Sequence, residues 1–194
     1  MYVARHAAAA YETDLLTDDG GSLTVAGRAQ AMALGHDLEA EGIVHVWTSP
    51  LARSVQTAEL AAATLVCGVT VREGLREFSV GAFAGRPVEP DPFVATYLQW
   101  LRGDLDARVD GGESGAEVAR RFVDVLDEVV GQHEGEAVLV LSHGGAMGVG
   151  LPALAANLAA DTPEHHPMPN CGLVELSHDG EDWRVVRWLD QELA

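Results

Sequence analysis

Short apolar runs alternate with longer segments of helical character along most of this chain. Four runs have the length and side-chain types of buried strands: residues 2–4, 44–47, 69–72 and 137–141. Helical patterns lie between and after them: residues 24–41, 51–65, 114–133 and 144–158. Strands that alternate with helices predict a mostly parallel sheet covered by helices on both faces.

Local signals refine this prediction. In the first helix, Ala29, Met32, Ala33 and Leu38 supply the expected apolar stripe, and Gly42 ends it. Ser114 with Glu117 has the spacing of a capping box. Two late runs, residues 173–176 and 183–188, flank the turn dipeptide Asp179-Gly180 and predict a hairpin that adds an antiparallel strand at the sheet edge.

The expected fold is therefore an α/β three-layer α/β/α sandwich with a mostly parallel central sheet and an antiparallel edge strand. We predict one domain over residues 1–194, which is an ordinary length for a single core. Residues 86–110 have little periodicity and contain Pro87, Pro90 and Pro92. We expect that segment to form a lid or insertion over the site.

Charge limits what the protein can bind. The chain has 30 Asp and Glu but only 12 basic residues, all of them Arg, which gives a formal net charge of −18. Such a surface repels nucleic acid and anionic membranes, so we expect neither as a partner. An anionic substrate would need a local group of arginines. The two cysteines have no metal-type spacing, and neither a signal sequence nor a membrane-length apolar run is visible, so a cytoplasmic protein is expected.

Polar residues follow three of the predicted strands. Arg5-His6 ends the first, Thr48-Ser49-Pro50 leads to Arg53 after the second, and Ser142-His143-Gly144-Gly145 follows the strand at 137–141. Any one of these segments alone would more typically hold a residue that packs in the interior or forms a salt bridge than a residue of a binding site. Because ligands bind at the carboxyl ends of strands in such sheets, the three together indicate one anion-binding site.

These segments resemble the signatures of the histidine phosphatase superfamily, which includes the cofactor-dependent phosphoglycerate mutases. The resemblance covers nearly the whole chain and is carried by six segments in order: Arg5-His6; Leu23-Thr24-Val25-Ala26-Gly27-Arg28-Ala29-Gln30-Ala31; Thr48-Ser49-Pro50-Leu51-Ala52-Arg53-Ser54-Val55-Gln56-Thr57-Ala58; Leu75-Arg76-Glu77 with Gly81 and Gly85; Gly111-Gly112-Glu113-Ser114; and Ser142-His143-Gly144-Gly145.

The resemblance implies that His6 is the nucleophile and that Arg5, Arg53 and His143 hold the phosphoryl oxygens, with Glu77 as proton donor to the leaving group. The chemistry suits these residues, since phosphoryl transfer depends mainly on positioning and on charge stabilisation. His6 must be neutral, with one nitrogen free and the other donating to a backbone carbonyl. Gly144 would let a helix N-terminus approach the phosphate. We expect no metal and no cofactor.

Two departures bear on function. After Arg5-His6 the chain reads Ala7-Ala8-Ala9-Ala10-Tyr11-Glu12, and Glu12 stands where the family often has a phosphate-contacting Asn. Either Glu12 points away, or the loop takes another course, or the substrate carries a cationic group. Residues 86–110 also lack the paired arginines that the family's mutases use. Phe93, Tyr97 and Trp100 would either contact the leaving group of the substrate or pack in the hydrophobic core.

We therefore predict a phosphoric monoester hydrolase of the histidine acid phosphatase type, acting on a small phosphorylated metabolite through a phosphohistidine. A phosphoglycerate-type phosphomutase and a non-catalytic binding domain stay open as alternatives. A homodimer is also left open.

Overall fold

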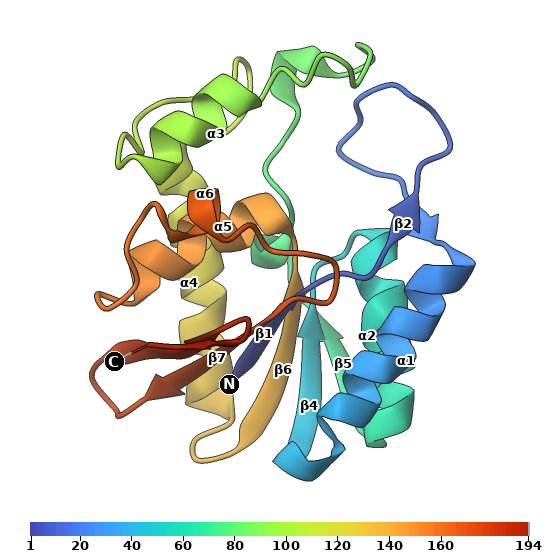
Figure 1. The fold of residues 1–194 in the computed structure, drawn as a ribbon, viewed down its shortest axis with the longest axis vertical. Coiled ribbons are helices and arrows are strands. Elements are labelled where there is room, and N and C mark those ends of the chain that lie inside the picture. Colours follow the sequence, from blue (N-terminus) through green and yellow to red (C-terminus); the bar gives the residue numbers. More distant parts are fainter. Residues whose placement is uncertain (194) are drawn as a thin grey trace.

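The computed structural model describes residues 1–193 and consists of a central sheet between two layers of helices (Figure 1). The main sheet of these residues has the order β5-β4-β6-β1-β7-β8-β9. Its strands are β1 (Tyr2–Arg5), β4 (Ile43–Thr48), β5 (Gly68–Val71), β6 (Ala137–Ser142), β7 (Leu173–His178), β8 (Trp183–Trp188) and β9 (Gln191–Glu192). Strands β5, β4, β6 and β1 run parallel, whereas β7, β8 and β9 pair antiparallel. The predicted sheet and its antiparallel edge are confirmed.

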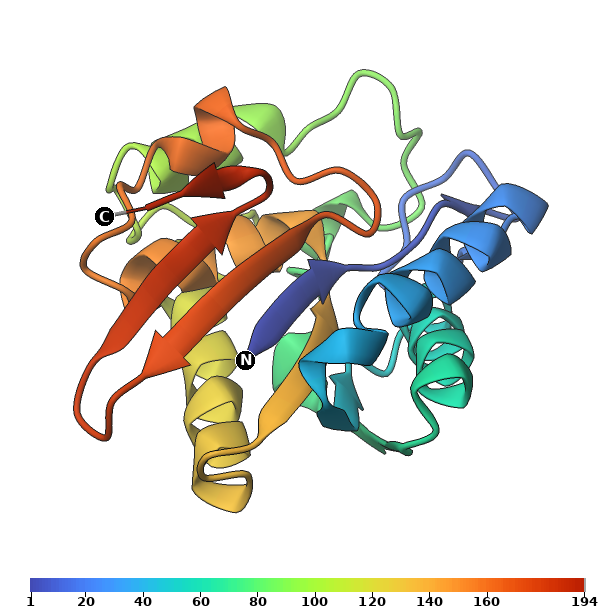
Figure 2. The same cartoon turned by 60° about the horizontal axis from the view of Figure 1, so that its bottom comes forward.

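Alternating side chains along the central strands form two separate cores. Tyr2 and Ala4 of β1 pack on one face with α1 (Val25–Asp37) and α2 (Ala52–Leu65). Val3, between them in sequence, packs on the other face with α4 (Gly115–Gln132) and α5 (Gly144–Leu154). This two-sided burial is typical of parallel strands and gives the three-layer sandwich seen in the second view (Figure 2).

The sequence predicts where the helices start better than it predicts which of their faces are buried. Ser114 and Glu117 form the predicted capping box of α4. Of the stripe predicted for α1, Leu38 is buried at the C-cap, but Ala29, Met32 and Ala33 are exposed, because the helix itself buries Gly27, Ala31, Leu34 and Gly35. Small residues let α1 approach α2 closely: a Cβ added at Gly35 would lie 2.9 Å from the Ala61 carbonyl oxygen. Hydrophobicity alone does not mark such a face.

Helix α5 ends at Leu154, four residues before the predicted end. Its C-cap, Ala155, has extended backbone angles. The residues that follow contact strand β8 and do not continue the helix. The side chain of Asn157 donates to the Val185 carbonyl at 2.8 Å and accepts from the Val185 N–H at 3.0 Å. Asn157 therefore gives β8 hydrogen-bond partners just beyond the end of the helix.

Several short elements were not predicted, and the end of the helix predicted over residues 24–41 forms a separate 3₁₀ turn after α1. Strands β2 and β3 form a separate ribbon, α6 precedes the last hairpin, and three 3₁₀ helices lie in connections. Their bounds are β2 Ala9–Ala10, β3 Ser22–Leu23, α6 Thr162–His165, and the 3₁₀ turns Glu39–Glu41, Glu73–Leu75 and Gly81–Phe83.

Helix α3 (Val94–Leu101) lies in the segment predicted as a lid, beyond the carboxyl ends of the parallel strands (Figure 1). Trp100 is almost fully buried there, and its indole donates to the Ala107 carbonyl at 2.7 Å. The segment is thus anchored, while its action as a lid and the single-domain organisation stay predictions. Within residues 1–193, no helix is long and apolar enough to cross a membrane.

Candidate active site

Three strand ends predicted to share one edge do so, because β4, β6 and β1 are adjacent in the sheet. The backbone pairing continues past the strands: the His6 N–H donates to the Ser142 carbonyl at 3.0 Å, and the Ser49 N–H donates to the Leu141 carbonyl at 3.1 Å. The rings of His6 and His143 therefore lie 5.1 Å apart, centroid to centroid. We call Arg5, His6, Arg53 and His143 the phosphoryl cradle.

His6 is held as a neutral ring with a defined tautomer. Its Nδ1 lies 2.8 Å from the Ala7 carbonyl, which can only accept, so Nδ1 carries the proton. Its Nε2 accepts a hydrogen bond from Arg53 Nε at 3.2 Å. Burial lowers the pKa of His6 to about 4, and the positive charges of Arg53 and Arg5 act in the same direction. The lone pair is thus on Nε2, which is the nitrogen that faces the arginine.

Arg53 occupies the first turn of α2 and is only 6% exposed. Its Nη1 donates to the Gly20 carbonyl at 2.9 Å, and its guanidinium lies 5.5 Å from the Tyr11 ring centroid. Thr57, one turn later, donates to the Arg53 carbonyl at 2.7 Å and accepts from the Ala7 N–H at 3.1 Å. One threonine therefore connects the arginine to the loop that follows the histidine.

Two buried side-chain nitrogens of the cradle have no hydrogen-bond partner among residues 1–193: Arg5 Nε and His143 Nδ1. Arg5 is fixed by its Nη1, which donates to the Met168 carbonyl at 2.8 Å. A buried polar atom without a partner costs free energy, and a bound anion would accept from Arg5 Nε, and also from His143 Nδ1 in the tautomer in which the Ser49 hydroxyl donates to Nε2. A third such atom, Trp47 Nε1, lies in the core.

His143 is fully buried, and its Nε2 lies 2.8 Å from the Ser49 hydroxyl. Burial holds its pKa well below the ordinary range, and the charges of Arg53 and Arg5 add to this. His143 is therefore neutral in this structure. A protonated His143 would require a dianion nearby to offset the arginines.

Glu77 lies over the first turn of α5. Its carboxyl accepts from the N–H groups of Gly145 at 3.0 Å and Ala146 at 2.8 Å. The Met147 N–H donates to the His143 carbonyl at 2.9 Å. A helix start leaves four N–H groups unpaired within the helix, so the donor left to meet a ligand is that of Gly144. The predicted phosphate contact at Gly144 thus lies beside the predicted proton donor.

Arg121 fixes the segment that carries Glu77, a role the sequence reasoning missed. From α4 it donates to the Arg76 carbonyl at 2.6 Å, to the Gly74 carbonyl at 2.8 Å and to the Glu113 carboxylate at 2.7 Å. Ser49 and Thr57 were also missed as partners of the cradle. Their only signal was their place within the quoted segments, because a hydroxyl contact depends on tertiary position.

The loop after His6 is held by the segment that begins α1. Ala8 donates to Gln30 Oε1 at 2.9 Å, and its carbonyl accepts from the Thr24 hydroxyl at 3.3 Å. Gly27 must lack a side chain, because a Cβ there would overlap the Ala8 carbonyl oxygen. The Leu-Thr-x-x-Gly-x-x-Gln pattern therefore shapes the nucleophile's loop from outside the cradle.

Glu12 is directed to the turn at Gly20 and Gly21. Its Oε2 accepts from the Gly21 N–H at 3.2 Å, and this bond lowers the pKa of the carboxyl. Gly20 in turn accepts from Arg53 through its carbonyl. Of the alternatives raised by the sequence, the structure favours a carboxylate that points away from the cradle and supports the turn behind Arg53.

Two cavities adjoin the cradle, and both are lined by Glu77, Phe78 and Phe93. The larger, of about 720 Å³, also includes Arg53 and is bounded by two segments, residues 11–21 and 78–93, which we call the rim. The smaller, of about 360 Å³, includes Arg5, Gly144 and Tyr97. Phe93 and Tyr97 thus line cavities, whereas Trp100 belongs to the core cluster beneath them.

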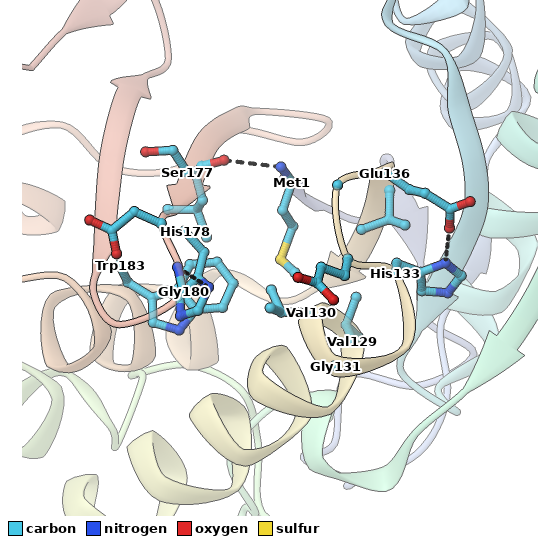
Figure 3. Close-up of a pocket in the computed structure, with 15 residues that line it drawn as sticks. Met1, Val129, Val130, Gly131, His133, Glu136, Ser177, His178, Gly180 and Trp183 are labelled. Atoms are coloured by element: carbon cyan, nitrogen blue, oxygen red, sulfur yellow. Dashed lines mark hydrogen bonds and ion pairs between the residues drawn. The ribbon is translucent and has the colours of Figure 1, made fainter.

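A separate hollow of about 680 Å³ lies at the opposite end of the sheet and is lined by Met1, His133, His178 and Trp183 (Figure 3). It contains none of the predicted site residues. Among residues 1–193, no three His, Cys, Asp or Glu side chains are grouped so that they could hold a metal ion.

The fold and the site define an α/β/α protein that gathers two histidines and two arginines at the carboxyl edge of a mostly parallel sheet. A family model described as the histidine phosphatase superfamily (branch 1) matches residues 1–191, and the chain belongs to that superfamily. It is 29% identical to a probable phosphoglycerate mutase of Erwinia tasmaniensis, over 97% of this chain and 89% of that protein.

Solved structures agree on the fold. A mycobacterial glucosyl-3-phosphoglycerate phosphatase complexed with VO3 superimposes with a TM-score of 0.80 at 25% identity, covering 98% of each chain. A phosphoserine phosphatase of Entamoeba histolytica, at 19% identity, has a TM-score of 0.78 over 97% of this chain and 95% of its own, and supports the fold alone.

Proposed function

We propose that this protein is a phosphomonoesterase that hydrolyses a small phosphorylated metabolite through a phosphohistidine on His6. The observation that carries the proposal is the tautomer of His6: Nδ1 donates to the Ala7 carbonyl, so the lone pair is on Nε2, which faces Arg53. A neutral, immobilised imidazole beside fixed positive charge is what nucleophilic attack on a phosphate ester requires.

In the first step, His6 Nε2 forms a bond to phosphorus while the bond from phosphorus to the ester oxygen breaks. Arg5, Arg53, His143 Nδ1 and the Gly144 N–H would hold the oxygens of the transferring group, because Arg5 Nε and His143 Nδ1 have no protein partner within residues 1–193, Gly144 lies beside Arg5, and the His143 ring is next to that of His6. Glu77, beside Gly144, would give its proton to the leaving alkoxide.

In the second step, water attacks phosphorus and the bond to His6 breaks. Glu77, left ionised by the first step, would take the proton of that water, and inorganic phosphate leaves. The cycle returns His6 to its neutral form, with Nδ1 still donating a hydrogen bond to the Ala7 carbonyl. Two displacements at phosphorus, each with a good donor set, replace one difficult hydrolysis.

The competing activity is phosphomutase, which the name of the Erwinia tasmaniensis relative favours. A mutase must hold a second anionic group of its substrate while phosphate moves. The two cavities that adjoin both the cradle and Glu77 have Arg53 and Arg5 as their only arginines among the described residues, and both belong to the cradle. This favours hydrolysis.

The test is phosphate release from a chromogenic phosphomonoester by the native chain, His6→Ala and a matched control. His36→Ala suits as control because His36 is an exposed histidine that contacts only Glu39. We expect activity in the native chain and in the control, and none in His6→Ala. Equal release by His6→Ala would disprove the phosphohistidine.

Quenching with labelled substrate separates hydrolysis from transfer and from binding alone. We expect an acid-labile label on the native chain that is absent from His6→Ala. Transfer of the label to added phosphoglycerate without net phosphate release would show a mutase instead. Neither release nor labelling with a panel of esters would indicate a binding domain.

A further inference from the structure

The leaving group of the substrate is expected in one of the two cavities that adjoin both the cradle and Glu77, the proposed proton donor. A third hollow, of about 410 Å³, is lined by Glu77, Arg76 and Arg121 but by no residue of the cradle. The walls of the two cavities at the cradle therefore report on what the substrate carries besides its phosphate. Most of the lining of the larger cavity is apolar: Tyr11, Leu15, Leu16, Val80, Pro87, Val88, Phe78 and Phe93.

The charged residues of that cavity are mainly acidic. Asp14 and Glu89 line it together with Glu77, and its one arginine is Arg53. Arg53 is already directed to His6 and to the Gly20 carbonyl. The smaller cavity repeats the pattern, with Asp91 in its wall and Arg5 as its arginine.

Arginines elsewhere are not placed to help. Six of them are ion-paired with carboxylates outside the cavities' apolar walls: Arg72, Arg76, Arg102, Arg108, Arg121 and Arg187. Arg86 belongs to the rim, but its guanidinium lies over the Phe83 ring at 5.2 Å from the centroid, and it lines neither cavity. The chain has no lysine that could replace them.

Asp14 and Glu89 are held at the mouth of the larger cavity by the backbone of the rim. The Val88 N–H donates to the Asp14 carbonyl at 2.9 Å, and the Leu16 N–H donates to the Arg86 carbonyl at 2.8 Å. Neither carboxylate takes part in an ion pair within residues 1–193. Their charge is thus left to act on whatever enters the cavity.

We propose that the two cavities that adjoin both the cradle and Glu77 select a leaving group that is apolar and either neutral or cationic, and that they disfavour a second anionic group such as the carboxylate of phosphoglycerate. This rests on the proposed phosphomonoesterase function and names its substrate class. Desolvating a carboxylate against an apolar wall, without a cation to pair with it and near like charges, is unfavourable.

The test compares kcat/KM for three aryl phosphates that differ in one substituent: phenyl phosphate, 4-(aminomethyl)phenyl phosphate and 4-carboxyphenyl phosphate. We expect the carboxylated ester to be poorer than the aminomethyl ester by about tenfold or more at low salt. At about 1 M salt, where the Debye length is about 3 Å, this ratio should shrink.

A double variant, Asp14→Asn with Glu89→Gln, isolates the cause. We expect it to improve the carboxylated ester relative to phenyl phosphate by about three- to tenfold compared with the native chain. The ratio between enzymes removes intrinsic differences in reactivity between the esters. The control is Asp124→Asn with Glu59→Gln, which makes the same change of charge on exposed faces of α4 and α2 and should leave the ratio unchanged.

The outcomes separate this inference from the function beneath it. Hydrolysis of all three esters with equal efficiency, or a preference for the carboxylated one, would overturn the inference and leave the phosphomonoesterase intact. A preference for the carboxylated ester that disappears in Arg86→Gln would show that Arg86 moves to bind it. Release from none of the esters would overturn the proposed function and this inference with it.

Discussion

The phosphoryl cradle and the rim lie next to each other but are built in opposite ways. Three cradle residues, His6, Arg53 and His143, are at most 6% exposed, and each has a defined partner. Rim residues such as Tyr11, Leu15 and Val88 are between 40% and 54% exposed and lie on irregular backbone. Rigid strand ends thus hold the reacting groups, while surface segments contact the variable part of a substrate.

The largest expected effect comes from breaking the cradle. Arg53→Ala should lower kcat toward a phosphomonoester by about 10²- to 10³-fold, because a fixed donor to the transferring group is lost. Arg53→Lys should recover only part, since an ammonium cannot reproduce the forked geometry. Arg28→Ala, at an exposed position of α1, serves as control. A loss below about threefold in Arg53→Ala would remove Arg53 from the proposed chemistry.

Burial of the cradle should also make stability depend on pH. The unfolded chain protonates His6 near its ordinary pKa of 6.5, whereas the folded chain does so only near 4. Between these values the unfolded state binds more protons, so the free energy of unfolding should fall as pH falls, by up to about 3 kcal/mol for this group.

Denaturant titrations at pH values from about 7 to 4 would measure this, with His6→Gln for comparison. The free energy of unfolding of the variant should fall less steeply as pH falls. It should still fall to some extent, because burial also lowers the pKa of His143. Identical pH slopes in the two proteins would contradict a buried, neutral His6.

Gly145 tests how the cradle meets the proton donor. A Cβ there would overlap the Phe78 ring and lie 2.6 Å from Glu77 Oε1, so Gly145→Ala should displace the carboxyl group. We expect kcat to fall by about 10- to 100-fold and stability by about 1–3 kcal/mol. Gly131→Ala in α4 is the matched control, since a Cβ there meets nothing within 4 Å. It should stabilise the fold by about 0.4–1 kcal/mol.

The smallest effect is expected in the rim, at Glu12. Its carboxyl accepts from Gly21, and a glutamine can make the same bond, so Glu12→Gln should change kcat/KM by less than about twofold. Steady-state kinetics would decide. A gain of about tenfold would mean that Glu12 faces the ligand and repels it.

The same contrast explains what the sequence could reveal. Arg5-His6, Arg53 and His143-Gly144 were predictable because strand periodicity places them at one edge, and β4, β6 and β1 prove to be neighbours. The course of residues 11–21 was not, because it depends on contacts such as Glu12 with Gly21 that have no periodic signal. Helix α1 shows a further limit: its buried face is marked by Gly27 and Gly35, and their packing depends on neighbours distant in sequence.

The backbone hydrogen bonds that join residues 14–16 to residues 85–88 limit how the substrate specificity of the protein can be engineered. The two halves of the rim are far apart in sequence but share one short ladder, including the bridge between Leu15 and Pro87. An insertion into one of the two rim segments, or its replacement by a loop from a relative, would leave the other segment without its hydrogen-bond partners. New specificities should therefore be sought by exchanging both segments together, as a single recombination unit.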